Sequence, residues 1–445
     1  YPGLRKQLRF CMSVAKDLQK PSLPRQLQQI SSQITGHISE SASHQDKRSL
    51  VHKPNLACSK RRTLAEILDG FPADPEAPSG TLFNPRIIRR NRDLNFGPQN
   101  YLTDTLSRSD PRDFVCTTEA GFYRIPITES VIFVGNDEEG NAIAELTVLR
   151  DVFGDDSPER EKLLACIDTA CSERRDVRPN HLGHMAQIGW NAGPRHARVW
   201  GPAKSYTKKL DTETRVEHDL DAVAALSLTW AVTKAVAPSN FSDHIEKVHA
   251  DNGLPKIATR DVPEGTGFRF VLEDKTFSFP LFERGPPEGY LTVDYSSSLH
   301  IDRAYISGAC AVSFNVGRKV DPKPARPASA TATAPSVLSR LRSGARNRKI
   351  SAPPTDPLVD DARLWPAAGG GNFVDMSLRV VIEQATGTLF IFDPKHRHGT
   401  TRLCGAHNYT ASFTFSQHIK DAFDKAKLSP QIDAGAGAGD GNFDA

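Results

Sequence analysis

The chain alternates between stretches with the two-residue period of strands and stretches with the 3.6-residue period of helices. Strand patterns occur at residues 121–126, 130–134, 142–149, 266–317, 377–383 and 387–392. The turn-forming residues 135–141 predict that the second and third of these strands form a hairpin. The region 266–317 is long enough for several successive strands, so the C-terminal half of the chain is expected to consist mainly of sheet.

Four segments have the pattern of helices, at residues 63–68, 157–173, 217–237 and 239–248. Ser157 followed by Pro158 is a usual helix start, with a cap residue and then proline in the first turn. Leu163, Ile167 and Cys171 then fall on one helical face. We expect the helices to brace a sheet, which predicts an α+β fold.

Three segments hold too few apolar residues to be buried and are expected to be disordered: residues 1–62, an insert at 317–361 and a tail at 433–445. The first holds twelve basic residues against three acidic ones, so it is either a solvated tail or a basic arm on nucleic acid. The insert is also basic, and its candidates for contact with nucleic acid are Arg340, Arg342, Arg346, Arg348 and Lys349.

The composition changes this picture only slightly. With 445 residues, of which 38% are hydrophobic, the chain can form one large or two ordinary domains. A net charge of +3 permits contact with nucleic acid without requiring it. The seven scattered cysteines suggest a reducing intracellular compartment, and no apolar run is long enough for a membrane span, so no membrane partner is expected.

The candidate chemistry lies in two segments far apart in sequence. His300 and Asp302 follow a strand pattern and are two residues apart, so on a strand their side chains point to the same face. His398 follows the strand pattern 387–392. Two histidines and one carboxylate form the facial triad of non-haem Fe(II) oxygenases, which leaves coordination positions open. His396 competes with His398 for the third position.

The interval between Asp302 and His398 constrains the fold. Without the insert, 51 residues remain between them, which is enough for four to six strands and their turns. This number suits a double-stranded β-helix, a cupin-like jelly roll, braced by helices. We therefore expect a support region of helices and strands at 63–180 and a domain at 181–432 that carries the triad.

A zinc site is a weaker interpretation of other residues. Cys166, Cys171, His181 and His184 could be grouped as ligands, but their spacing fits no usual zinc pattern. Both cysteines are instead expected to pack on the helix 157–173, and no structural zinc is predicted.

The segments His398-Gly399-Thr400-Thr401 and Ser412-Phe413-Thr414-Phe415-Ser416-Gln417-His418 resemble the Fe(II)/2-oxoglutarate dioxygenases of the TET/JBP type, especially the fungal branch. Members carry HxD, an HxTT-like segment and a strand that ends near a Gln-His pair, and TET proteins carry a low-complexity insert between the two ligand segments. The resemblance covers about residues 180–420. It implies that O₂ and 2-oxoglutarate are used to oxidise the methyl group of 5-methylcytosine or thymine in a flipped base.

One position departs from the family. The family holds the far carboxylate of 2-oxoglutarate with an arginine two residues before a serine; here Ser412 matches the serine, but Thr410 stands at the arginine position. A threonine cannot form the two parallel hydrogen bonds of a guanidinium. Either Arg402 has taken over this role or the chain is a degenerate copy. The intact ligand segments favour Arg402.

The resemblance therefore favours a monomeric nuclear dioxygenase that uses Fe(II), 2-oxoglutarate and O₂ to oxidise a methylated base in DNA. Two alternatives remain open. The same fold could act on RNA, protein or a small molecule, or the chain could be a catalytically degenerate relative that only binds nucleic acid.

Overall fold

The structure is a computed structural model of the chain. It describes residues 63–69, 77–82, 84–89, 122–153, 157–179, 181–193, 199–203, 206–207, 209–263, 268–272, 275–279, 284–302, 304–321, 368–401 and 403–428. The N-terminal arm at 1–62 and the tail at 433–445 lie outside these residues. None of the described helices is both long and apolar enough to cross a lipid bilayer.

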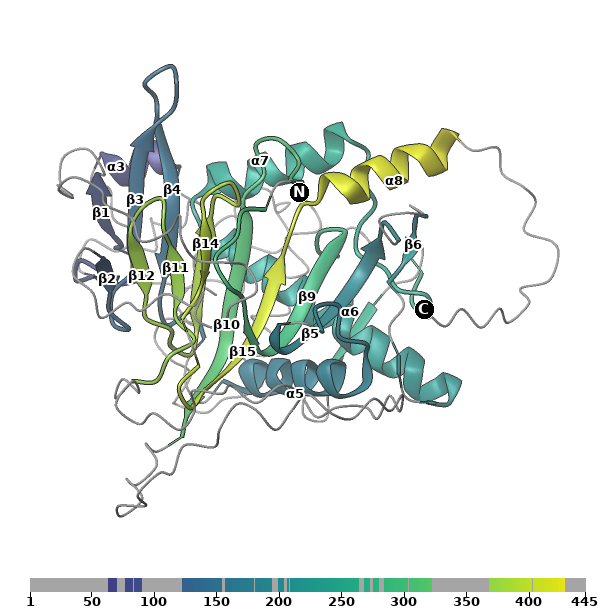
Figure 1. The fold of residues 1–445 in the computed structure, drawn as a ribbon. Helices are drawn as coiled ribbons and strands as arrows, with labels where there is room; N and C mark the ends of the chain where they lie inside the picture. The colour runs from purple at the N-terminus through teal and green to yellow at the C-terminus, as the bar shows by residue number, and fades with distance from the viewer. Residues whose placement is uncertain are drawn as a thin grey trace, which may run out of the picture.

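Nine strands form one large sheet in the order β1–β3–β4–β13–β10–β15–β9–β5–β6 (Figure 1). Their bounds are β1 Arg86–Arg89, β3 Val131–Asn136, β4 Ala142–Leu149, β5 Leu182–Asn191, β6 Gly201–Pro202, β9 Glu288–Ser296, β10 Ala311–Val320, β13 Thr388–Phe392 and β15 Ala406–Phe413. β1 pairs with β3 in parallel, and the other neighbours are antiparallel. β3 and β4 form the hairpin that the turn residues predict.

A smaller sheet of four strands has the order β14–β11–β12–β2. Its strands are β2 Tyr123–Ile125, β11 Phe373–Asp375, β12 Val380–Ile382 and β14 His398–Thr400. The two sheets share a core in which Phe373 of β11 packs against Phe390 and Phe392 of β13, with ring centroids 4.8 and 4.7 Å apart. Because side chains alternate along a strand, Leu389 and Ile391 of β13 face the opposite side and join the core beneath the helices.

A buried arginine ties the two sheets together at the turn after β2. Arg150 donates hydrogen bonds to the hydroxyl of Thr388 at 2.8 Å and to the carbonyl oxygens of Pro126 and Ile125 at 3.0 and 3.2 Å. Burial lowers the pKa of Arg150 to about 10, so it stays charged at neutral pH.

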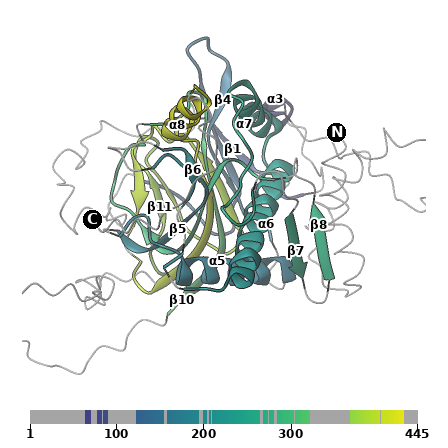
Figure 2. The same cartoon turned by 90° about the vertical axis from the view of Figure 1, so that its right-hand side faces the viewer.

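Five helices lie in the described ranges. They are α3 Leu64–Leu68, α5 Pro158–Glu173, α6 Thr212–Val236, α7 Ser239–Asp251 and α8 Gln417–Leu428. α5 and α6 share one core with β9, β10 and β15. Figure 2 shows α6 between this sheet and the hairpin of β7 Phe268–Leu272 and β8 Lys275–Phe279. The chain thus has a mixed α+β fold with large sheets.

The helix starts follow local capping. The side chain of Ser157 accepts a hydrogen bond from the amide of Arg160, and Pro158 is the first helical residue, as the sequence predicts. α6 begins five residues before the predicted start of 217, because the carboxylate of Asp211 accepts the amide of Thr214 at 2.8 Å and caps the helix there.

Two predicted strand boundaries are wrong. Residues 317–320 were assigned to the insert, but they continue β10, which pairs with β15 as far as Val320. The strand expected at 377–383 is limited to β12, because residues 376–379 form a turn in which Arg379 has a positive φ of 54°.

The described chain resumes beside the point where β10 ends. The guanidinium of Arg318 on β10 donates hydrogen bonds to the carbonyl oxygens of Ala368 and Gly370, at 2.7 and 2.8 Å. The amide of Asp321 donates to the carbonyl oxygen of Gly405 at 2.8 Å. The chain therefore leaves and re-enters the described structure at one side of the sheet.

Candidate metal centre

The two ligand segments predicted from the sequence pair with each other through their backbones. The amide of His300 donates to the carbonyl oxygen of His398 at 2.8 Å, and the amide of His398 donates to the carbonyl oxygen of His300 at 2.9 Å. The amide of Asp302 donates to the carbonyl oxygen of Pro394 at 3.1 Å. The separation of the three side chains is therefore set by backbone pairing and not by a flexible loop.

Both imidazole rings are held in one tautomer. Nδ1 of His300 lies 2.8 Å from the carbonyl oxygen of Ser298, and Nδ1 of His398 lies 2.7 Å from the carbonyl oxygen of His396. A carbonyl oxygen can only accept a hydrogen bond, so Nδ1 carries the proton in each ring. The lone pair of each Nε2 is left available, which is the arrangement that supports metal binding by histidine.

The carboxylate of Asp302 lies between the two free nitrogens. Its Oδ1 is 3.7 Å from Nε2 of His300, and its Oδ2 is 3.7 Å from Nε2 of His398. These distances are too long for hydrogen bonds. One ligand atom from each residue lies within 4.8 Å of the others, and this is the group of three or more His, Cys, Asp or Glu in the described ranges that could hold a metal ion.

The centre is closed on one side and open on the other. The side chain of His398 is 5% exposed, whereas those of His300 and Asp302 are 36% and 34% exposed. Phe373 and Phe392 pack against the ring of His398, with centroids 5.7 and 4.8 Å away. Burial, together with the neighbouring His300, lowers the pKa of His398, which favours the neutral imidazole that a metal ion requires.

The residues after His398 explain why this segment reads Gly-Thr-Thr. A Cβ atom at Gly399 would lie 3.1 Å from the carbonyl oxygen of Ser297, so a larger residue would push the two segments apart. Thr400 accepts a hydrogen bond from the amide of Ser297 at 3.0 Å, and Thr401 accepts one from the amide of Asn372 at 3.0 Å. The motif joins the two ligand segments to β11.

His396 does not point to the same place as the three candidate ligands. Its Nδ1 lies 2.8 Å from Oδ2 of Asp375, a carboxylate that is completely buried. Burial alone would lower the pKa of His396, but the hydrogen bond and the charge of Asp375 outweigh it and raise the pKa. Of the two histidines that the sequence left open, His398 therefore lies with His300 and Asp302, and His396 contacts Asp375.

Comparison with known proteins adds little to this geometry. No protein-family model matches the chain, and no curated protein matches its sequence. Among solved structures, the fold is similar to that of NgTET1 in complex with 5mC DNA, with 8% sequence identity, a TM-score of 0.34 and coverage of 69% of this chain and 86% of that chain. A likeness this distant carries no functional argument, so we base the function on the centre itself.

The candidate cosubstrate residues lie partly within the described structure. Ser412 is opposite Ser313 and Tyr290 in the large sheet, and its hydroxyl lies 3.2 Å from that of Ser313. Thr410 is two residues earlier on β15, so both side chains point to the same face. Ser313, the partner of Ser412, is opposite Phe390, which belongs to the core between the two sheets. The side chains of Thr410 and Ser412 therefore face the small sheet. Arg402 and the basic candidates Arg340, Arg342, Arg346, Arg348 and Lys349 lie outside the described residues.

A buried acid near the centre has no local signal in the sequence. Glu288, at the start of β9, accepts hydrogen bonds from the hydroxyl of Tyr290, from Thr414 at 3.1 Å and from Gln187 at 2.8 Å. Burial raises the pKa of Glu288 to about 7. These partners come from three strands or strand ends, so the cluster cannot be predicted before the sheet is known.

Arg178 is a described cation that the sequence analysis also missed. It lies in a turn in which the amide of His181 donates to its carbonyl oxygen at 2.9 Å, and the ring of His181 stacks on Tyr295. Burial raises the pKa of Tyr295 to about 12, and the charge of Arg178 opposes this rise. Its charge acts in the same way on Glu288 and Tyr290.

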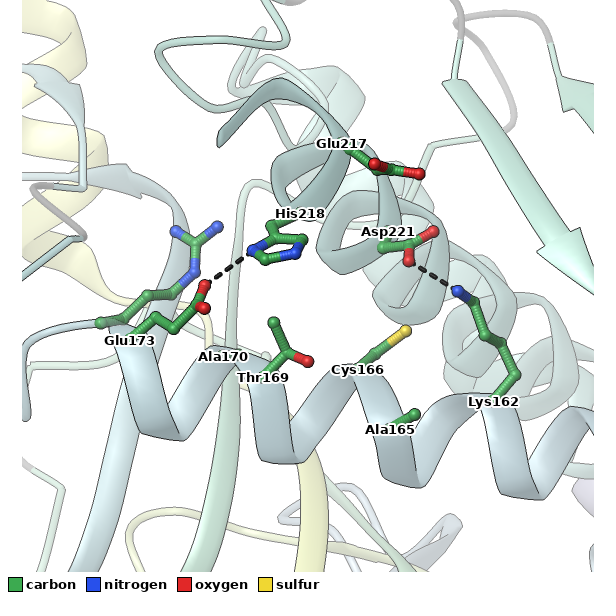
Figure 3. A pocket seen from close by; sticks show the side chains of 10 residues that line it. Lys162, Ala165, Cys166, Thr169, Ala170, Glu173, Glu217, His218 and Asp221 are labelled. Atoms are coloured by element: carbon green, nitrogen blue, oxygen red, sulfur yellow. Dashed lines mark hydrogen bonds and ion pairs between the residues drawn. The ribbon is translucent and has the colours of Figure 1, made fainter. Parts of the chain in front are cut away.

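A second cluster of polar side chains lies in a pocket between α5 and α6 (Figure 3). Oε2 of Glu173 lies 2.7 Å from Nδ1 of His218, and Nζ of Lys162 lies 2.6 Å from Oδ2 of Asp221. Burial raises the pKa of Cys166, at the floor of this pocket, to about 12, so its thiol stays protonated. The packing of Cys166 on its helix is confirmed.

Proposed function

We propose that this protein is an Fe(II)- and 2-oxoglutarate-dependent dioxygenase that oxidises the methyl group of 5-methylcytosine, or of thymine, in DNA. The observation that carries the proposal is the convergence of His300, Asp302 and His398, with both Nε2 atoms facing one carboxylate. Two neutral imidazoles and a carboxylate are the donor set that non-haem Fe(II) oxygenases use. The resemblance in sequence supplies the substrate class.

The strand order supports a double-stranded β-helix as the frame of this centre. β9 lies in the large sheet, and the chain then pairs at His300 with His398 of β14, in the small sheet. β10 lies in the large sheet, and β11 and β12 lie in the small one. β13 returns to the large sheet, β14 to the small sheet and β15 to the large one. Such alternation between two facing sheets is how a jelly roll is wound.

The residues of the centre fit the role of iron ligands. His300, His398 and Asp302 would hold the ion, and the carbonyl oxygens of Ser298 and His396 would keep the two rings in the metal-binding tautomer. When bound, the iron supplies the activation of O₂ and the oxidation of the methyl group. The exposure of His300 and Asp302 leaves one side of the site accessible to substrate.

The fit to 2-oxoglutarate depends on a cation elsewhere than β15. Thr410 has no guanidinium, so the two parallel hydrogen bonds of the family cannot form at this position. We propose that Arg402 holds the far carboxylate, as its place after His398 suggests.

Thr410 also favours a second candidate function, a degenerate relative that binds nucleic acid without turnover. This candidate predicts DNA binding that weakens with salt, no uptake of iron and no effect of His300→Ala on DNA affinity. Iron uptake and turnover separate this candidate from the first, whereas DNA binding that weakens with salt is expected of both.

The test is to incubate the protein with Fe(II), 2-oxoglutarate, O₂ and duplex DNA that carries 5-methylcytosine. We expect succinate and oxidised 5-methylcytosine in similar amounts, and much less succinate with the same duplex lacking the methyl group. Succinate without an oxidised base would move the substrate to RNA, protein or a small molecule. Production of neither would contradict the dioxygenase assignment. A raised KM for 2-oxoglutarate in Arg402→Ala would support its role in holding the cosubstrate.

A further inference from the structure

One histidine of the large sheet lies between two carboxylates that come from its two neighbouring strands. His407 is on β15, which lies between β9 and β10 in the sheet. Its Nδ1 is 2.7 Å from Oδ2 of Asp294 on β9, and its Nε2 is 3.2 Å from Oδ2 of Asp321, the residue after β10. A single imidazole ring therefore connects three adjacent strands.

Both contacts of His407 require a proton on the ring. An ionised carboxylate can only accept hydrogen bonds, so each ring nitrogen must carry a hydrogen to bond its aspartate. A neutral imidazole has one such hydrogen, and only the protonated ring has two. The hydrogen bond to Asp294 is the main cause that raises the pKa of His407, with a further contribution from Asp321, and together they outweigh the opposing effect of partial burial.

The other charged groups near this end of β15 do not contact the ring. Lys319 of β10 is opposite His407, but its Nζ lies over the ring of Tyr409, 5.8 Å from the centroid. On α5, which packs against β15, the charge of Asp168 acts on Tyr409. The protonation of His407 is therefore governed by the two aspartates that contact it.

The two aspartates are held with unequal firmness. The side chain of Asp294 is 21% exposed, and its Oδ1 also accepts the amide of Asn408 at 2.9 Å. The side chain of Asp321 is 65% exposed, and only its backbone amide has a further bond, to the carbonyl oxygen of Gly405 at 2.8 Å. When the ring loses one proton, the shorter and less exposed contact with Asp294 keeps the other, and Asp321 then faces a lone pair.

We propose that His407 is a pH-dependent latch, which holds the end of β10 to β9 and β15 while the ring is protonated and releases Asp321 when the ring becomes neutral. Because the pKa of His407 is raised in the folded protein, the latch is complete below the usual histidine pKa and opens as the pH rises through the raised one. Asp321 is the last residue of the described range 304–321, so the latch determines where the chain leaves the sheet. The inference does not depend on the metal centre.

The first experiment measures the pKa of His407 by NMR in the full chain, with ¹³C at Cε1 of histidine and His407→Gln to assign the signal. We expect a pKa above about 6.5, lowered most by Asp294→Asn and less by Asp321→Asn. Asparagine tolerates the positive φ of 57° at position 294, so this variant should fold. The matched control is Asp424→Asn, which removes an exposed ion pair on α8, beyond the opposite end of β15, and should leave the pKa unchanged.

Hydrogen exchange of the Asp321 amide, corrected for the intrinsic effect of pH, tests the release itself. Its protection should fall about 2–5-fold as His407 loses its proton, the size expected for an exposed ion pair. This step should be absent in His407→Gln. A pKa of His407 that is not raised, or that neither aspartate variant lowers, would overturn the inference. A step that persists in His407→Gln would overturn it as well.

Discussion

The metal centre and the pocket between α5 and α6 contain the same kinds of side chain but use them differently. In the pocket, Lys162 contacts Asp221, and Glu173 contacts His218, at hydrogen-bonding distance (Figure 3). In the centre, the carboxylate of Asp302 stays 3.7 Å from both imidazole nitrogens. The pocket pairs its charged groups with one another, and the centre holds them apart.

The backbone makes this difference. In the centre, Nδ1–H of each histidine donates a hydrogen bond to a carbonyl oxygen two residues earlier in the chain, so the lone pair of Nε2 remains available. In the pocket, Nδ1 of His218 contacts the carboxylate of Glu173 directly. A cluster of titratable residues therefore indicates a ligand site only when other groups fix those residues and leave their lone pairs free.

The largest expected effect comes from removing a ligand. Asp302→Ala and His398→Ala should abolish metal binding and turnover, a greater loss than the roughly 10–100-fold that follows removal of a supporting residue. His396→Ala is the matched control, because its backbone carbonyl still orients His398 and only the contact with Asp375 is lost. Calorimetric titration with Fe(II) under anaerobic conditions measures the metal affinity of each variant. Equal loss in His396→Ala and His398→Ala would mean that the third ligand is misassigned.

The next largest effect is a loss of stability when a paired charge is removed beside the pocket between α5 and α6. Arg174 and Asp219 form a buried ion pair beside the pocket, and Tyr206 also donates to Asp219 at 2.6 Å. Asp219→Ala leaves the guanidinium without its partner, which should cost about 3–5 kcal/mol in the free energy of unfolding.

The control is Lys162→Met, in a pair whose side chains are 24% and 23% exposed, which should cost about 1 kcal/mol or less. Urea denaturation gives both values, and metal affinity of the folded protein should be unchanged in each. If Asp219→Ala were as stable as the unaltered protein but failed to bind metal, the pocket and the metal centre would not be independent of each other.

The smallest effect is the contribution of Glu288 to the pH dependence of stability. Burial raises the pKa of Glu288 to about 7, so the folded protein keeps a proton that the unfolded chain releases above about pH 4.5. The contribution of Glu288 to the free energy of unfolding should therefore fall by about 3 kcal/mol as the pH rises from 4.5 through 7, while His249, whose burial lowers its pKa to about 4, contributes in the opposite direction. Glu288→Gln should remove this slope, and Glu138→Gln, on the exposed turn after β3, should keep it. Denaturation curves at several pH values decide between these outcomes.

Much of the candidate site was predictable because its signals are local. HxD and a histidine after a β-run point to His300, Asp302 and either His396 or His398 without any tertiary knowledge. The start of α5 was predictable for the same reason. Glu288 gave no such signal, since two of its three hydrogen-bond partners, Gln187 and Thr414, lie more than 100 positions away.

β5 was missed for a different physical reason. Gly183 and Gly189 interrupt its pattern and have positive φ values of 76° and 99°. Gly183 sits where the register with β9 shifts, and a Cβ there would collide with the backbone of Asp294 at 2.2 Å. Glycine in a strand pattern suggests a turn, but here it allows a bulge and a close approach between neighbouring strands.

Arg318 holds together the two points between which the length of this chain can vary. Because its guanidinium fixes the carbonyl oxygens of Ala368 and Gly370 next to the end of β10, the backbone geometry of β10 and β11 is independent of how many residues separate them. Length and composition between 322 and 367 can then change by substitution, deletion or domain insertion at little entropic cost. The end of β10 and the chain at Ala368 and Gly370 thus form a point in the fold where the connecting segment can vary in length.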